Sequence, residues 1–135
     1  MLSPQFALGA EPLYTGFFSN TFIQGYDPVA YFTDGKPVKG RKDLTTDYQG
    51  VEIRFASEAH RAQFLESPDA YLPQYGGYCA WAVAQNKTAK GDARYWKIVD
   101  DKLYLNYDKK VQSTWEGDIP GFIEKADGNW PTVLN

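Results

Sequence analysis

Apolar and charged side chains alternate in two stretches of the chain, and each stretch predicts a β-hairpin. In VEIRF, residues 51–55, the apolar positions share one face of an extended strand and the charged positions share the other. Gln49-Gly50 just before it supplies a turn, so LTTDYQGVEIRFAS has the pattern of one hairpin. YWKIVDDKLYLNY, residues 95–107, repeats the pattern around Asp100-Asp101-Lys102 and predicts a second hairpin.

Capping signals and prolines mark short helices between and after these hairpins. Ser57 is a good N-cap and predicts a helix over residues 58–66. Ser67 is a second cap signal, and the proline after it predicts a short helix that ends near Leu72. Further helices are expected at residues 78–85, 109–116 and 120–126, of which the first is apolar on nearly every side and is expected to be buried.

The order of these elements predicts an α+β fold. Before the first hairpin we expect a turn at Pro28 that leads into one helical turn, and a short strand over residues 37–39. The connections are too short for many parallel crossovers, so we expect a small antiparallel sheet built from two hairpins, with several short helices packed around it. Residues 1–20 are expected to form an N-terminal arm and residues 21–135 a single domain.

Composition and charge narrow the possible partners. At 135 residues the chain is long enough to fold without a metal or a disulfide. Its net charge is −3 and it has no long basic run, which argues against nucleic acid as a partner. The longest uncharged apolar stretch, around YCAWAVA, is too short to span a bilayer. Nothing in the pattern indicates the oligomeric state.

The N-terminus and the lone cysteine bear on the compartment. Ala7, Leu8, Gly9 and Ala10 are like the small residues around a signal-peptidase site, which suggests the remnant of an export signal, whereas the same residues also suit an ordinary arm. Cys79 cannot form an internal disulfide, so cysteine usage does not identify the compartment.

Several segments together resemble one family. They are GYDPVAYF, GKPVKG, YQGVEIRFASEAHRAQFLESPDAYLPQYGGYCAWAVAQ, LYLNY and ADGNWP, which extend from about Ile23 to Trp130. In these segments the chain resembles YHS-domain proteins, and specifically their exported bacterial branch. The resemblance implies a single YHS-like domain over residues 21–135, a periplasmic location and a metal-associated role.

The metal-binding residues of that family are only partly present. The metal-type YHS pattern has a cysteine after Asp-Pro-Val, whereas here Asp27-Pro28-Val29 is followed by Ala30. In the next part of the pattern Ala56 stands at the first cysteine and His60 at the second, with Phe64 closing the motif. The usual thiol site is therefore not intact.

Residues that remain could still hold a soft metal. His60 occupies a ligand position of the family, although a lone histidine one turn before an apolar Phe64 is also typical of a polar residue at the edge of the core. Cys79 among apolar neighbours is either a buried hydrophobe or a thiolate ligand. We expect a non-catalytic protein that binds copper first and zinc second through His60, with Cys79 and Asp27 as the other ligands.

Two other functions remain open. The protein could be a periplasmic small-molecule or protein-interaction module that has lost the metal site with Ala30 and Ala56. The tyrosine-rich segments QYGGYCAWAV and LYLNY then either line a small-molecule pocket or form an aromatic core. An enzyme that uses Cys79 and His60 as nucleophile and base is less favoured, because the sequence supplies no orienting third group and no oxyanion hole.

Overall fold

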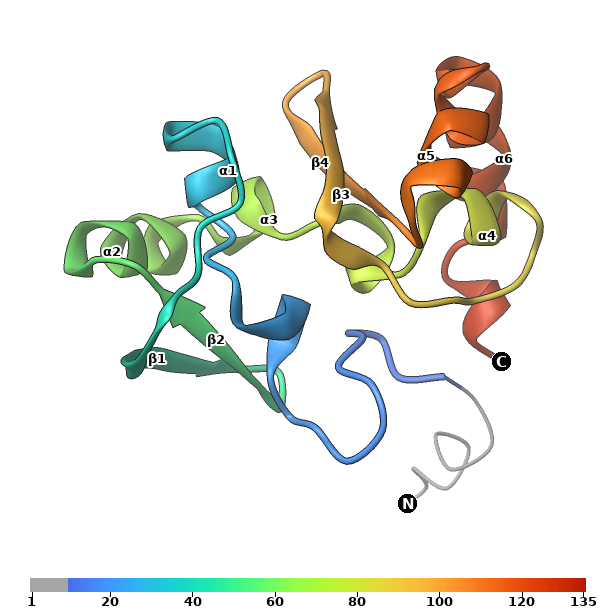
Figure 1. Cartoon of the computed structure of the whole chain (residues 1–135). Coiled ribbons are helices and arrows are strands. Elements are labelled where there is room, and N and C mark those ends of the chain that lie inside the picture. The colour runs from blue at the N-terminus through green and yellow to red at the C-terminus, as the bar shows by residue number, and fades with distance from the viewer. Residues whose placement is uncertain (1–9) are drawn as a thin grey trace.

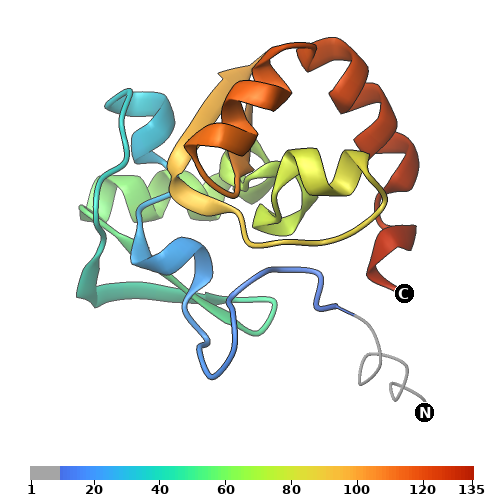
Figure 2. The same cartoon turned by 45° about the vertical axis from the view of Figure 1, so that its right-hand side comes forward.

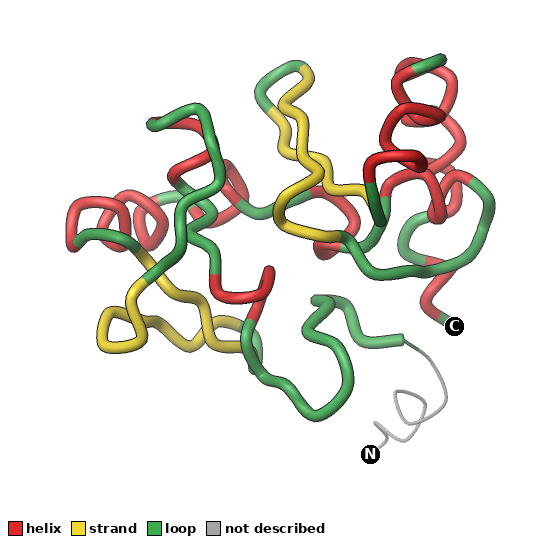
Figure 3. Tube along the Cα trace, viewed as in Figure 1, coloured by secondary structure: helices red, strands yellow, loops and turns green. Residues whose placement is uncertain are grey.

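The computed structural model describes residues 10–135, and within them it confirms the α+β fold with two antiparallel hairpins (Figure 1, Figure 3). The elements follow one another as η2 (Phe22–Gly25), α1 (Ala30–Thr33), β1 (Arg41–Tyr48), β2 (Val51–Phe55), α2 (Glu58–Glu66), α3 (Pro68–Tyr71), η3 (Gln74–Gly77), α4 (Ala80–Ala84), β3 (Asp92–Val99), β4 (Lys102–Asn106), α5 (Lys109–Glu116), α6 (Ile119–Asn129) and η4 (Thr132–Leu134).

The first hairpin forms as its alternation predicts. Tyr48 of β1 pairs with Val51 of β2, and the two turn residues, Gln49 and Gly50, have φ of 50° and 89°. Positive φ at both central positions is the geometry of the turns that suit a hairpin's twist. The apolar side chains of β2 are buried and its charged ones are half-buried on the other face, so one face of this hairpin covers the core.

The second hairpin turns at the two acidic residues. Val99 pairs with Lys102, and Asp100 and Asp101 between them have φ of 52° and 63°. Both aspartates are exposed, as expected for adjacent acids in a turn. The two hairpins form separate two-stranded sheets rather than one continuous sheet.

Helix α2 begins and ends where its caps predict. The Ser57 hydroxyl accepts a hydrogen bond from the His60 backbone N–H at 3.1 Å, which satisfies a donor of the first turn. Ser67 stands at the N-cap of α3, Pro68 begins the helix and Leu72 follows its end, as predicted, but the Ser67 side chain makes no capping hydrogen bond. The backbone N–H of Ser67 instead bonds to carbonyls of the last turn of α2.

Three of the predicted boundaries differ from the structure. Helix α4 begins at Ala80 rather than residue 78, because Tyr78 and Cys79 are extended and form single β-bridges with Lys90 and Leu105. The strand expected over residues 37–39 is reduced to one bridge between Tyr26 and Lys39. Helix α6 continues past its expected end to Asn129.

In the described chain the apolar side chains gather in two clusters, and β4 stands between them. Leu103 and Leu105 belong to the cluster that holds β2 and Phe64, whereas Tyr104 belongs to the cluster that holds Trp115. Alternate side chains of a strand point to opposite faces, so β4 is buried on both. Figure 1 shows α1, α2 and the β1–β2 hairpin on one side of the β3–β4 hairpin, with α4 to α6 on the other. In the turned view of Figure 2, α4 and α6 again lie apart from α1 and α2.

The described part of the predicted arm is hydrogen-bonded to the rest of the chain. Its backbone donates from Tyr14 to the Gly76 carbonyl at 2.9 Å and from Ala10 to the Leu134 carbonyl at 2.8 Å. Residues 7–9 of the export-signal hypothesis lie outside the described residues. Among residues 10–135 no helix has both the length and the apolar character needed to cross a membrane.

Candidate functional site

The site begins with Asp27, a fully buried carboxylate just before α1. Its Oδ1 accepts a hydrogen bond from the Val29 backbone N–H at 2.8 Å, which shapes the turn that leads into α1. Its Oδ2 accepts a second backbone bond, from Ala56 at 2.9 Å, at the end of β2. Buried charge is costly unless it is hydrogen-bonded, so these donors are what allow an aspartate at this position.

His60 completes the partners of this carboxylate. Its Nδ1 lies 2.6 Å from Asp27 Oδ2, and its side chain is 14% exposed. Because an ionised carboxylate can only accept, the hydrogen on Nδ1 points at Asp27. In the neutral ring the lone pair is then on Nε2, the nitrogen that faces away from the buried aspartate. The local fold of α2, capped by Ser57 at the His60 amide, aims the ring in this direction.

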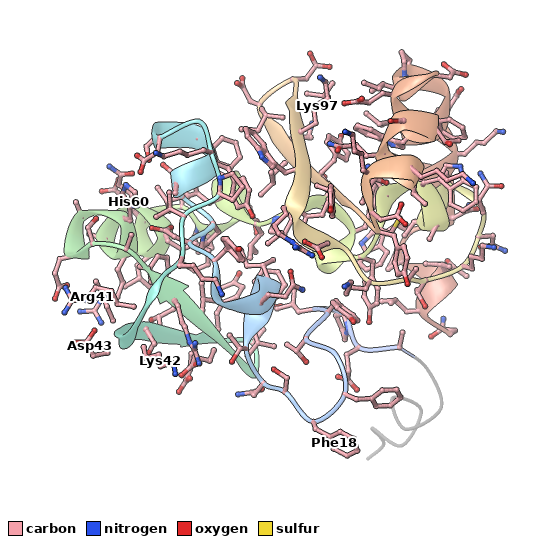
Figure 4. The ribbon with its side chains drawn as sticks, in the orientation of Figure 1. Phe18, Arg41, Lys42, Asp43, His60 and Lys97 are labelled. Carbon is pink, nitrogen blue, oxygen red and sulfur yellow. The ribbon has the colours of Figure 1, made fainter. Side chains whose placement is uncertain are left out.

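Two residues at the end of α1 face the outer nitrogen of the ring. Thr33 Oγ1 lies 3.1 Å from His60 Nε2, and Asp34 Oδ1 lies 3.9 Å from the same nitrogen. The Thr33 hydroxyl is also 2.9 Å from Asp34 Oδ1, so hydroxyl and carboxylate are held together. Figure 4 shows His60 at this junction between α1 and α2. We call Asp27, Thr33, Asp34 and His60 the His60 cluster.

Cys79 is placed elsewhere. Its Sγ is 3.5 Å from Asn106 Oδ1 of β4, and its backbone N–H donates to the Ala89 carbonyl. It is 1% exposed, and burial raises the pKa of its thiol. In the part of the chain that the structure describes, no group of three or more histidine, cysteine, aspartate or glutamate side chains is arranged so that it could hold a metal ion.

Of the three residues expected to ligate a metal, the structure therefore brings His60 and Asp27 together and does not bring Cys79 to them. The same separation applies to a Cys79 and His60 nucleophile-base pair. Asp27 also differs from its expected use, because its oxygens already accept three N–H groups and it orients the ring.

Thr33 and Asp34 are the members of the cluster that sequence reasoning missed. The dipeptide Asp34-Gly35 is a turn signal and gives no hint of a partner 26 residues along the chain at His60. A pairing of His60 with Asp27 would have given a clue. It places the ring beside the helical turn that follows Pro28, and Thr33 and Asp34 lie at the end of that turn.

A comparison with protein-family models decides which domain this is: the model of the YHS domain matches residues 29–75. Residues 29–75 form a YHS domain. No curated protein and no solved structure matches the chain. The YHS domain contains Thr33, Asp34 and His60, whereas Asp27 lies two residues before it and Cys79 lies four residues after it.

The YHS match covers one side of the fold and about a third of the chain. It runs from the start of α1 through both strands of the first hairpin to α3, and it ends at Tyr75. The second hairpin and helices α4 to α6 lie outside the matched residues. Thr33, Asp34 and His60 of the His60 cluster therefore lie within the match and Asp27 lies just before it, whereas Cys79 lies after it.

Proposed function

We propose that this YHS-domain protein binds a transition-metal cation, copper first and zinc second, at His60 Nε2, without catalysing a reaction. The observation that carries the proposal is the pairing of His60 Nδ1 with the buried Asp27 carboxylate at 2.6 Å. Histidines that bind metals almost always donate their other ring N–H to a carboxylate, a carbonyl or water, which fixes the ring and makes the free nitrogen more basic.

The fit of the residues to a metal can be judged from Asp34. Bonds of about 2.0–2.2 Å from a metal to nitrogen and oxygen place two ligand atoms roughly 3–3.5 Å apart in a tetrahedral site. Asp34 Oδ1 is 3.9 Å from His60 Nε2, and the Asp34 side chain is 40% exposed and able to turn. A shift of about half an ångström therefore makes these two groups a chelating pair.

The chemistry of this pair sets the metal. Imidazole nitrogen with carboxylate oxygen suits copper(II) and zinc, and among divalent cations copper(II) binds such ligands most tightly. Copper(I) prefers thiolate, and Cys79 is bonded to Asn106 rather than placed beside His60. Water would complete the coordination, because the cluster supplies one nitrogen and one carboxylate, with the Thr33 hydroxyl beside them.

The test is a titration of untagged protein with Cu(II) and with Zn(II), followed by calorimetry and by the Cu(II) electron paramagnetic resonance spectrum. We expect one equivalent to bind, with nitrogen couplings from a single imidazole. His60→Gln should lose this binding and Asp34→Asn should weaken it about tenfold, because each removes one of two ligands. Asp101→Asn, an exposed acid in the hairpin turn, is the matched control and should bind as the wild type does.

Two other results of this titration bear on the proposal. If the wild type and His60→Gln bind copper alike, the proposal is wrong. Cys79→Ser decides whether the thiol takes any part: unchanged binding removes Cys79 from the ligand set, and lost binding would mean that two chains share one metal.

Export is a second part of the proposal. It is supported by the small residues at Ala7 to Ala10 and by the resemblance of the chain to exported YHS-domain proteins. The measurement is mass spectrometry of the protein from fractionated cells of its source. A periplasmic fraction with a processed N-terminus near these residues is expected, and recovery in the cytoplasmic fraction alone would contradict export.

A further inference from the structure

An open cavity of about 310 Å³ lies outside the residues of the YHS match. It is bordered by α4, the loop that follows α4 and the first turn of α5, and Cys79, Trp81, Tyr107 and Val111 are among its lining residues. Small-molecule sites in proteins have volumes of roughly 300–1,000 Å³, so this one is large enough for a small ligand. It is distinct from the His60 cluster, which lies between α1 and α2.

Half of the lining residues come from the two tyrosine-rich segments of the sequence. Trp81 belongs to QYGGYCAWAV and Tyr107 belongs to LYLNY, so each segment contributes an aromatic side chain to the cavity. Other tyrosines of these segments belong to the aromatic core, because the Tyr75 hydroxyl donates to Asp127 and the Tyr78 hydroxyl donates to the Glu11 carbonyl. The same segments therefore supply both a core and a cavity wall.

The two aromatic walls each carry a lysine. Lys87 Nζ lies 5.6 Å from the centroid of the Trp81 ring, and Lys90 Nζ lies 5.7 Å from that of Tyr107. Lys90 is also 3.4 Å from Asp92, whereas Lys87 forms no ion pair within residues 10–135. Lys87 itself lines the cavity, so an uncompensated ammonium stands beside an aromatic wall.

Polar groups behind the cavity are buried and uncharged. The Cys79 thiol is held by Asn106 Oδ1, and Asn106 is 1% exposed with no partner for its side-chain Nδ2. Trp81 and Val111 contribute apolar surface to the cavity. The Tyr107 side chain is large and apolar, and 47% of it is exposed. The cavity thus combines an apolar interior with positive charge from Lys87.

We propose that this cavity binds a small aromatic anion, whose ring lies between Trp81 and Tyr107 and whose acidic group pairs with Lys87. Stacking on the walls supplies the apolar part of the affinity, and charge complementarity with the free lysine selects an anion over a neutral compound. The proposal uses none of the residues of the metal site, so the two stand or fall separately.

The test compares two probes of the same shape, 2-naphthoate and 2-naphthamide, by titration of the 15N-labelled protein in NMR. We expect 2-naphthoate to shift the Trp81 indole signal and the amide signals of residues 79–89, and to bind about threefold to tenfold more tightly than 2-naphthamide. Lys87→Gln should remove this preference and leave 2-naphthamide binding unchanged. Lys42→Gln, on the first hairpin (Figure 4), should change neither.

A second variant tests the place of binding. Ala89→Leu fills the cavity from its lining and should abolish the shifts from both probes, while the remaining amide signals show that the protein is folded. The proposal is overturned if neither probe shifts signals around the cavity, if both bind equally to the wild type, or if Lys87→Gln keeps the preference for the anion.

Discussion

Asp27 and His60 are 33 residues apart in the chain, and a single carboxylate oxygen of Asp27 contacts both the His60 ring at 2.6 Å and the Ala56 backbone N–H at 2.9 Å. The other oxygen binds the Val29 N–H. One buried side chain therefore joins the turn before α1, the end of β2 and the first turn of α2. Its contribution to stability should be large whether or not a metal binds at His60.

Asp27→Asn should lower the free energy of unfolding by about 2–4 kcal/mol, because an amide has one accepting oxygen and would turn its NH₂ toward at least one N–H donor. Urea denaturation at neutral pH measures this. The isosteric control is Asp101→Asn, exposed in the hairpin turn, which should change stability by less than about 0.5 kcal/mol. Equal effects of the two variants would show that the three hydrogen bonds of Asp27 contribute little.

Substitution of two glycines with positive φ distinguishes the cost of a steric clash from the cost of the backbone conformation alone. At Gly76, with φ of +61°, an added Cβ would overlap the Pro12 carbonyl of the arm, whereas at Gly35, with φ of +70°, it would meet nothing within 4 Å. Gly35→Ala should cost about 1 kcal/mol, the usual penalty for a side chain in this region. Gly76→Ala should cost at least about 2 kcal/mol more or detach the arm.

Limited proteolysis near Tyr14 and denaturant unfolding measure these two consequences. If Gly76→Ala is no more costly than Gly35→Ala and the arm stays protected, the close approach of Pro12 is not a constraint on the fold.

Asp92 should make stability depend on pH in the acid range. Its hydrogen bonds with Arg94, at 2.9 and 3.0 Å, lower the pKa of the carboxyl from 3.8 to about 2. A lowered pKa favours the folded state above the unfolded value, so this contribution is complete above about pH 5 and is lost as the pH falls from about 4 to about 2. The difference in pKa corresponds to about 2 kcal/mol.

The measurement is the free energy of unfolding of the wild type and of Asp92→Asn between pH 2 and pH 6. Because other acids titrate in both proteins, only the difference between them is informative. It should be about 2 kcal/mol near pH 6 and should shrink toward zero near pH 2. A difference that stays constant with pH would contradict the assigned role of Arg94.

Ser57 and Ser67 offer a matched pair for the capping hydrogen bond. Ser57 accepts from the His60 N–H, whereas the Ser67 side chain caps nothing. Ser57→Ala should therefore lower the thermal midpoint, with a cost of about 1 kcal/mol, and Ser67→Ala should cost less than about 0.5 kcal/mol. Thermal unfolding followed by circular dichroism compares them. If Ser67→Ala is the more costly of the two, the capping argument is wrong for both.

Local signals account for the parts of the fold that sequence reasoning reached. The period-two alternation of residues 51–55 and the turn at Gln49-Gly50 fix a hairpin from neighbours alone, and the same holds for the second hairpin. The bounds of α2 follow from Ser57 and from Ser67-Pro68 at its two ends. Each of these signals acts within a few residues of the chain, so no tertiary contact was needed.

The remaining features depend on contacts between distant segments. Cys79 looked helical, and its bridge to Leu105 keeps it extended. Ser67 has the residue type of a cap, but the end of α2 uses its backbone. In the candidate site the residue types of Asp27 and His60 drew attention, whereas the position of Thr33 and Asp34 at the ring results from packing of α1 against α2, which no spacing along the sequence encodes.

The bond from the Ala10 N–H to the Leu134 carbonyl has a consequence for how the chain reaches its native state. It closes a loop that contains nearly every described residue, and such contacts form only after the intervening segments are in place. During synthesis Ala10 leaves the ribosome long before Leu134, so this bond waits for the whole of the chain between them, whereas the bond from Tyr14 to Gly76 waits only for residues 15–76.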